Sequence, residues 1–195
     1  MSDVSWADVA ELESWLRARE VTMAGWGEGE AKTVENLWHE VQGGETLLVE
    51  EGDMVLRLVS FVQVIIRRGD RWLVEAEQVL ADGRVRRRAV LPSEKFKRGE
   101  SYALAAGRCL AEELNVGAGE FELLTETYRW RKERMERPTY PGLETLYTFH
   151  QVEVVVAGLP DDNFETENRL AGPSDPVRIH RWEWRLVEGD GWHYE

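Results

Sequence analysis

The sequence of 195 residues contains a single cysteine, Cys109. An internal disulfide is therefore impossible, and so is a zinc or iron–sulfur site built from several cysteines of this chain. The longest apolar stretch, residues 59–66, is far shorter than the ~20 residues that a membrane-spanning helix needs. The amino end also lacks the basic and apolar blocks of a signal peptide. These absences predict a soluble protein of the cytoplasm with no membrane partner.

Basic residues are also in short supply. Lysine and arginine number 24 against 37 aspartates and glutamates, which gives a formal charge of −13 at neutral pH. Such a charge opposes nonspecific attraction to DNA, RNA or an anionic membrane, so we expect no nucleic-acid partner. The length, with 43% hydrophobic and 31% charged residues, suits one globular domain spanning residues 1–195.

The first 45 residues have the pattern of two short amphipathic helices. Ser5 and Asp8 are candidate caps for the first helix, in which apolar residues recur at helical spacing until about Glu20. A glycine-rich connector leads to a second helix over residues 34–41, which ends at a pair of glycines. Residues 1–45 are therefore expected to form a helical extension that precedes the core, residues 54–187.

The core alternates strand and helix signals, so the predicted fold class is mixed α and β. An Ala- and Leu-rich helix is expected over residues 101–114. Asp82-Gly83 favours a tight hairpin between two of the strands. A loop near the end is expected to hold a short helix over residues 166–170. The predicted strands, rich in β-branched and aromatic residues, are 54–66, 72–80, 85–91, 121–131, 146–157 and 177–187.

Residues 94–116 carry the pattern with the clearest chemical content. The pattern resembles the Nudix box, G-x5-E-x7-R-E-U-x-E-E-x-G-U with U aliphatic. The positions that match in register are Glu100, Arg108, Leu110, Glu112, Glu113 and Val116. The resemblance implies a Nudix-like α/β/α sandwich with a mixed β-sheet, to which the helical extension is an addition. It also implies hydrolysis of the diphosphate in a nucleoside diphosphate-linked metabolite, with Mg²⁺ or Mn²⁺ held on the box helix.

Three box positions depart from the family pattern. Asn115 stands where the second glycine belongs, and asparagine is the usual alternative at a left-handed helix end. Glu94 replaces the first glycine, which narrows the conformational freedom of the loop. Cys109 replaces a glutamate and is a poor ligand for a hard cation. At about 100° per residue, Cys109, Glu112 and Glu113 share one facet of the helix.

The resemblance assigns roles to several acidic residues and one arginine. Glu112 and Glu113, with support from Glu100, would hold the metal, and Arg108 would orient a carboxylate. Glu144 is the candidate general base in a later loop. Its rivals there are Glu133 and Glu136.

A basic strand leads into the box. Because side chains alternate along a strand, Arg84, Arg86 and Arg88 would share one face and could bind the diphosphate of the ligand. An exposed strand whose like charges discourage edge pairing explains the same pattern equally well.

The sequence thus supports two functions. The first is a divergent Nudix-type hydrolase that uses Mg²⁺ or Mn²⁺. The second is a Nudix-fold module without catalysis that binds a nucleotide-like ligand or a protein partner, and Cys109 and Glu94 are the reasons for it. The sequence carries no signal for the oligomeric state.

Overall fold

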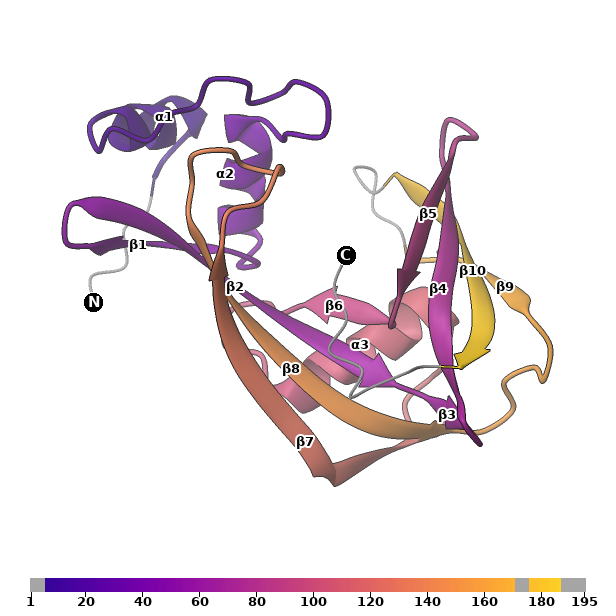
Figure 1. Cartoon of the computed structure of the whole chain (residues 1–195). Helices are drawn as coiled ribbons and strands as arrows, with labels where there is room; N and C mark the ends of the chain where they lie inside the picture. The colour runs from indigo at the N-terminus through magenta and orange to yellow at the C-terminus, as the bar shows by residue number, and fades with distance from the viewer. Residues whose placement is uncertain (1–5, 171–175, 187–195) are drawn as a thin grey trace. The chain divides into compact units, whose positions relative to one another are not determined.

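A computed structural model describes residues 6–170 and 176–186 of the chain (Figure 1). Three helices and ten strands are present in this part. In chain order they are α1 (Val9–Arg17), α2 (Val34–Gln42), β1 (Leu47–Glu51), β2 (Met54–Ile65), β3 (Arg67–Arg68), β4 (Arg71–Leu80), β5 (Val85–Val90), β6 (Ser93–Lys95), α3 (Tyr102–Leu114), β7 (Phe121–Met135), β8 (Thr145–Val156), β9 (Phe164–Glu167) and β10 (Val177–Leu186). The predicted mixed α and β class is confirmed, with two helices before the first strand.

The chain divides into two compact units. Unit 1 consists of residues 1–61, 95–100 and 130–149, and unit 2 of residues 62–94, 101–129 and 150–195. One sheet has the strand order β1-β2-β8-β7 with β6 also paired to β2, and the other has the order β3-β4-β10-β9 with β5 also paired to β4. The single domain expected over residues 1–195 stays a prediction.

Unit 1 holds the N-terminal helices. Asp8 caps α1 by accepting a hydrogen bond from the Glu11 N–H, as a β-region N-cap residue does. Ser5, the other expected cap, lies outside the described residues. The two helices pack together and, with β1 and β2, bury a core. That core contains Leu12, Leu16, Leu37, Leu48 and Val55.

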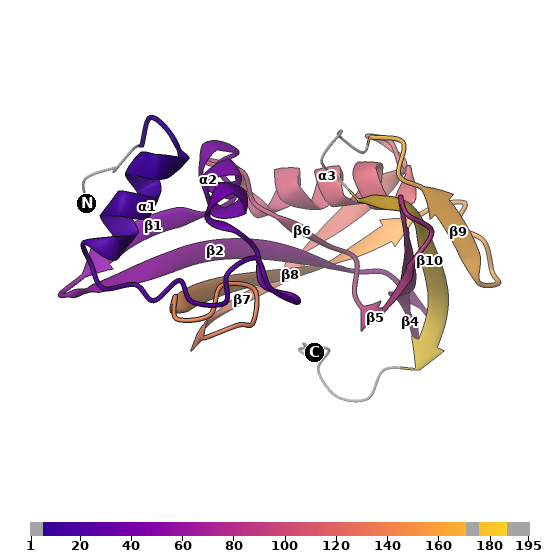
Figure 2. The same cartoon turned by 90° about the horizontal axis from the view of Figure 1, so that it is seen from above.

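Unit 2 holds the second sheet and the box helix α3. Strand β4 pairs antiparallel with β5 on one side and with β10 on the other, and β9 extends the sheet beyond β10 (Figure 2). The predicted hairpin is confirmed, because Gly83 adopts a φ of 83° at the turn between β4 and β5. None of the helices in the described ranges is long and apolar enough to span a membrane.

The structure corrects three expectations near the sheet edges. The short helix expected over residues 166–170 is wrong, because Phe164–Glu167 forms strand β9 against β10. Strand β1 (Leu47–Glu51) was not expected, and β7 continues to Met135 into a segment expected to be a loop. In each case a neighbouring strand pairs with the segment, and short local patterns carry no information about that partner.

Helix α3 ends as its sequence predicts. Asn115 adopts the left-handed conformation, with a φ of 56°, and its side-chain Nδ2 donates to the Glu167 carbonyl 3.0 Å away. The backbone N–H groups of Asn115 and Val116 donate to the Leu110 carbonyl, so the αL cap satisfies a carbonyl of the last turn and fixes the C-terminus of the box helix.

We expect Asn115→Ala to lower the free energy of unfolding by about 1 kcal/mol, because alanine tolerates the left-handed region less well than asparagine. Chemical denaturation measures the change. Asn115→Gly is the matched control, since glycine adopts the same backbone freely and loses only the side-chain hydrogen bond. Equal loss in both variants would show that the hydrogen bond, not the backbone conformation, matters at this position.

Candidate functional site

The box helix turns one facet toward the interior of unit 2. Ser101 caps α3 by accepting from the Leu104 N–H, which fixes where the helix begins. Cys109 is fully buried, and its Sγ lies 3.7 Å from Oε2 of Glu113, one turn later. Glu113 is only partly buried. On this facet the Cys109 thiol is therefore buried, and the Glu113 carboxylate beside it is partly exposed.

Arg108 links two further carboxylates of the box. Its Nη1 lies 3.2 Å from Oε1 of Glu94 and 3.5 Å from Oε2 of Glu112. The Arg108 and Glu94 side chains are 17% and 23% exposed, so this pair is shielded from water much more than a typical surface ion pair. Glu94, which replaces a glycine of the family pattern, thus brings an additional carboxylate to the helix.

Crowding of carboxylates controls protonation at Glu113. Burial raises the pKa of Glu113 well above its ordinary value, and the charges of Glu75 and Glu94 raise it further. Arg88 and the Ser93 N–H oppose this effect. Burial and the neighbouring Glu113 likewise raise the pKa of the Cys109 thiol well above its usual range. At neutral pH the thiol is neutral and a weak ligand or nucleophile.

Glu75 is the site residue that the sequence did not indicate. It lies on β4, is 2% exposed, and accepts hydrogen bonds from His180 Nδ1 at 2.5 Å and Gln78 Nε2 at 2.7 Å. Arg88 Nε approaches its second oxygen at 3.2 Å. A buried carboxylate needs such donors to offset its lost hydration. In sequence Glu75 is one polar residue in a mostly apolar strand, and no motif contains it.

The three arginines of the basic strand have different surroundings. Arg84, at the hairpin, contacts Asp82 at 2.7 Å and is 77% exposed. Arg86 Nε donates to Gln78 Oε1 at 3.0 Å, and Arg88 contacts Glu75. The structure therefore anchors Arg86 and Arg88 on buried polar side chains of β4, and Arg84 on its own turn.

The other predicted acidic residues belong to unit 1. Glu100 lines a cavity of about 750 Å³ within unit 1, and its Oε2 accepts from the Lys97 N–H at 2.8 Å. Glu144 lies 3.5 Å from Arg134 Nη1. Its rivals also have partners there, since Glu133 contacts Arg131 and Glu136 accepts from the Gly142 N–H. Their metal-binding and general-base roles stay predictions.

The carboxylate oxygens on and near α3 are chemically suitable ligands for a hard divalent cation. Carboxylate oxygens of Glu94, Glu112 and Glu113 are the ligand type that Mg²⁺ and Mn²⁺ prefer, whereas the Cys109 thiol is not. The raised pKa of Glu113 indicates excess negative charge that a cation would offset. Among residues 6–170 and 176–186, however, no three acidic, histidine or cysteine side chains are already close enough to hold an ion.

Comparison with known proteins finds solved structures with low similarity to this chain, among them one described as a NUDIX hydrolase. No family model matches the chain, and no curated protein matches it. A NUDIX hydrolase from Nitrosomonas europaea is 19% identical over 64% of this chain and 71% of its own, with a TM-score of 0.38. An Ap4A hydrolase from C. elegans is 12% identical over 65% and 77%, with a TM-score of 0.34. The E. coli ORF135 protein is 17% identical over 70% and 77%, with a TM-score of 0.35.

Proposed function

We propose that the chain is a divergent Nudix-type hydrolase that cleaves the diphosphate of a nucleoside diphosphate-linked metabolite. The observation that carries the proposal is the contact of Arg108 with both Glu94, at 3.2 Å, and Glu112, at 3.5 Å, on a helix whose sequence matches the Nudix box in register at six positions. The charges of Glu75 and Glu94 also raise the pKa of Glu113, beyond the effect of its burial. A carboxyl group with a raised pKa beside other carboxylates is typical of sites that bind a cation or transfer a proton.

In this proposal Glu113 and Glu112 hold Mg²⁺ or Mn²⁺, with Glu94 in place of the carboxylate that Cys109 cannot supply. The bound ion supplies Lewis-acid chemistry, which activates water and offsets phosphate charge. Arg108 keeps Glu94 and Glu112 in place through its two ion pairs. Arg86 and Arg88 bind the diphosphate. Water attacks one phosphorus, the P–O bond of the bridge breaks, and two phosphate esters are released.

ADP-ribose is a suitable first test substrate, because its hydrolysis yields AMP and ribose 5-phosphate, which chromatography separates. We expect Mn²⁺-dependent release of AMP, and about a 10²-fold lower rate for Glu113→Gln, the scale on which one electrostatic catalytic group acts. Glu122→Gln is the matched control, because Glu122 is an exposed glutamate of unit 2 on β7. Equal rates for the two variants would contradict the role of Glu113.

Calorimetry gives a test that does not depend on the chosen substrate. Because the pKa of Glu113 is raised, a proton competes with Mn²⁺ for this carboxyl group, so Mn²⁺ binding should release a proton at any pH at which the group is protonated. Titration in two buffers of different ionisation enthalpy measures that proton. Binding without proton release, or binding that survives Glu113→Gln, would place the ion elsewhere.

A Nudix-fold module without catalysis is the second candidate. It is favoured by the buried, neutral Cys109 thiol at a ligand position and by the lack of a ready-made set of three metal ligands among the described residues. Ligand binding without Mn²⁺ binding and without AMP release would support this module, which would then recognise a nucleotide-like ligand or a protein partner.

A further inference from the structure

Strand β4 contains one extra residue, Ala76, opposite Arg181 and Trp182 of β10. Glu77 pairs with Arg181, and the next β10 residue, Trp182, pairs with Glu75. Ala76 therefore has no partner on β10, which is the arrangement of a β-bulge. Bulges bend a strand and change the direction of neighbouring side chains, and they are frequent next to functional sites.

The opposite edge of β4 is irregular at the same position. Arg88 and Ala89 of β5 together face the single residue Ala76. Ala89 adopts a φ of 66°, a left-handed conformation that is unfavourable for a residue other than glycine. Such a conformation persists only where the surrounding structure imposes it. The two irregularities together define the geometry around Glu75.

The bulge explains why Glu75 and Gln78 lie together. Residues three apart in a regular strand point to opposite faces, because side chains alternate. Here Gln78 Nε2 donates to Glu75 Oε1 at 2.7 Å, and both side chains are buried. The extra residue at Ala76 thus places two polar side chains on one face of β4, where an unbroken strand would separate them.

These two side chains hold two arginines of the neighbouring strand. Gln78 Oε1 accepts from Arg86 Nε at 3.0 Å, and Glu75 Oε2 lies 3.2 Å from Arg88 Nε. His180 Nδ1, from β10, binds the other oxygen of Glu75 at 2.5 Å.

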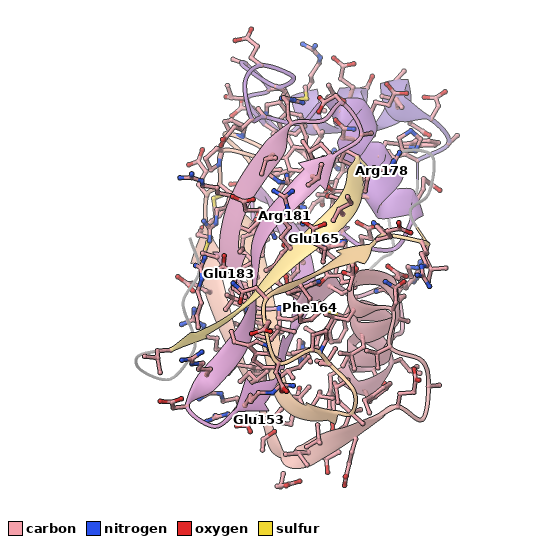
Figure 3. The ribbon with its side chains drawn as sticks, turned by 90° about the vertical axis from the view of Figure 1, so that its right-hand side faces the viewer. Glu153, Phe164, Glu165, Arg178, Arg181 and Glu183 are labelled. Carbon is pink, nitrogen blue, oxygen red and sulfur yellow. The ribbon has the colours of Figure 1, made fainter. Side chains whose placement is uncertain are left out.

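The outward face of β10 carries Arg178, Arg181 and Glu183, next to Glu165 of β9 (Figure 3). His180 belongs to the opposite, buried face of the strand.

We propose that Glu75 and Gln78, braced by His180, are positioning residues that hold Arg86 and Arg88 as a paired binding site for the two phosphates of a diphosphate. The proposal rests on the proposed function for the identity of the ligand, but not on hydrolysis. Arginine binds phosphate through a planar fork of N–H donors, and a guanidinium that is already oriented loses less entropy on binding.

Exposure and charge both bear on this role. Arg86 and Arg88 supply the positive charge of the site, whereas Glu75 and, near Arg88, Glu113 supply negative charge. Arg86 is exposed, and Arg88 is 33% exposed, so a ligand can reach both. Glu75, at 2% exposure, is not accessible to a ligand itself and therefore acts through the arginines.

Calorimetry with inorganic pyrophosphate, with and without Mg²⁺, tests the proposal. We expect Arg88→Ala and Glu75→Gln each to weaken pyrophosphate binding about 10-fold, as loss or weakening of a charged hydrogen bond does. The double variant should bind no more weakly than Arg88→Ala alone, because Glu75 acts through Arg88. Arg87→Ala is the matched control, since Arg87 lies on the same strand, is 93% exposed and should leave binding unchanged.

Additive effects of Glu75→Gln and Arg88→Ala, or unchanged binding in Glu75→Gln, would overturn the proposal. Gln78→Met is a second variant for the case in which Glu75→Gln does not fold, and it should weaken binding through Arg86 alone. Non-additive effects of Glu75→Gln and Arg88→Ala on pyrophosphate binding, together with no AMP release, would contradict the hydrolase and support the positioning role of Glu75. AMP release together with additive effects would support the hydrolase and contradict the positioning role.

Discussion

Replacing Glu40 with glutamine should lower the free energy of unfolding by about 3–5 kcal/mol, the usual cost of removing one partner of a buried ion pair. Glu40, on α2, is 7% exposed, and its Oε2 lies 2.7 Å from Arg57 Nη2, a side chain that is 4% exposed. Lys32 and Lys95 contact its other oxygen at 2.6 and 3.2 Å. Without the carboxylate, the Arg57 guanidinium stays buried with no counter-charge.

Thermal and chemical denaturation measure this loss. Since about 1 kcal/mol shifts the melting temperature of a chain of this length by about 2–4 °C, we expect a fall of about 10 °C. Glu35→Gln is the matched control, because Glu35 lies on the same helix, is 71% exposed and has only a 3.9 Å contact with His39. A loss of less than 1 kcal/mol in Glu40→Gln would show that solvent reaches the cluster and already compensates Arg57.

The Glu40 carboxylate also makes the free energy of unfolding depend on pH in the acid range. The charges of Lys95, Arg57 and Lys32 outweigh the effect of burial and lower the pKa of Glu40 from 4.5 to about 2. A lowered pKa stabilises the folded state above pH 4.5, and this contribution is lost as the pH falls toward about 2. The shift corresponds to about 3 kcal/mol. In Glu40→Gln the slope of stability against pH between 4.5 and 2 should be correspondingly smaller.

Replacing Cys109 with glutamate, the residue of the family pattern, should destabilise the metal-free protein by about 3 kcal/mol or more. Cys109 is fully buried, with Glu113 in contact and Glu94 near enough to affect its pKa. A new carboxylate would add charge where carboxylates already crowd. Its pKa would be raised, so the destabilisation should appear above about pH 4.5 and grow until the pH reaches that raised value.

Cys109→Gln is the matched control, because glutamine has nearly the same shape as glutamate without the charge. The difference in unfolding free energy between the two variants isolates the electrostatic cost. Equal stability of both at pH 7 would mean that the pKa of the introduced carboxyl group is not raised, because the group is hydrated or paired, and that the neighbouring carboxylates affect this position little.

If the box helix holds a metal, Mn²⁺ should restore the unfolding free energy that Cys109→Glu loses in the metal-free protein. A ligand that binds only the folded state raises the unfolding free energy by about 2.7 kcal/mol at 100 times its dissociation constant. We expect Mn²⁺ to stabilise Cys109→Glu more than Cys109→Gln, and to raise AMP release about 10²-fold over the unsubstituted chain. Neither gain would be expected from a module without catalysis.

The sequence by itself determined most of the local structure. The two N-terminal helices, the box helix with its Asn115 cap, and the hairpin at Asp82-Gly83 follow from spacing, capping residues and turn chemistry, all of which are local properties. The register of the box also placed Cys109, Glu112 and Glu113 on one helix facet, because the helical repeat fixes relative directions along the chain.

Only the tertiary structure decided which residues far apart in the chain meet. Glu75 and His180 are 105 positions apart, yet they form a 2.5 Å contact because β4 pairs with β10 across a bulge at Ala76. Strand β9 exists for the same reason, since β10 supplies its partner. Strand pairing is a non-local interaction, and one extra residue reverses the face on which a side chain lies. Periodicity along the sequence therefore could not predict the face on which Glu75 lies, or the side chains that Arg86 and Arg88 contact.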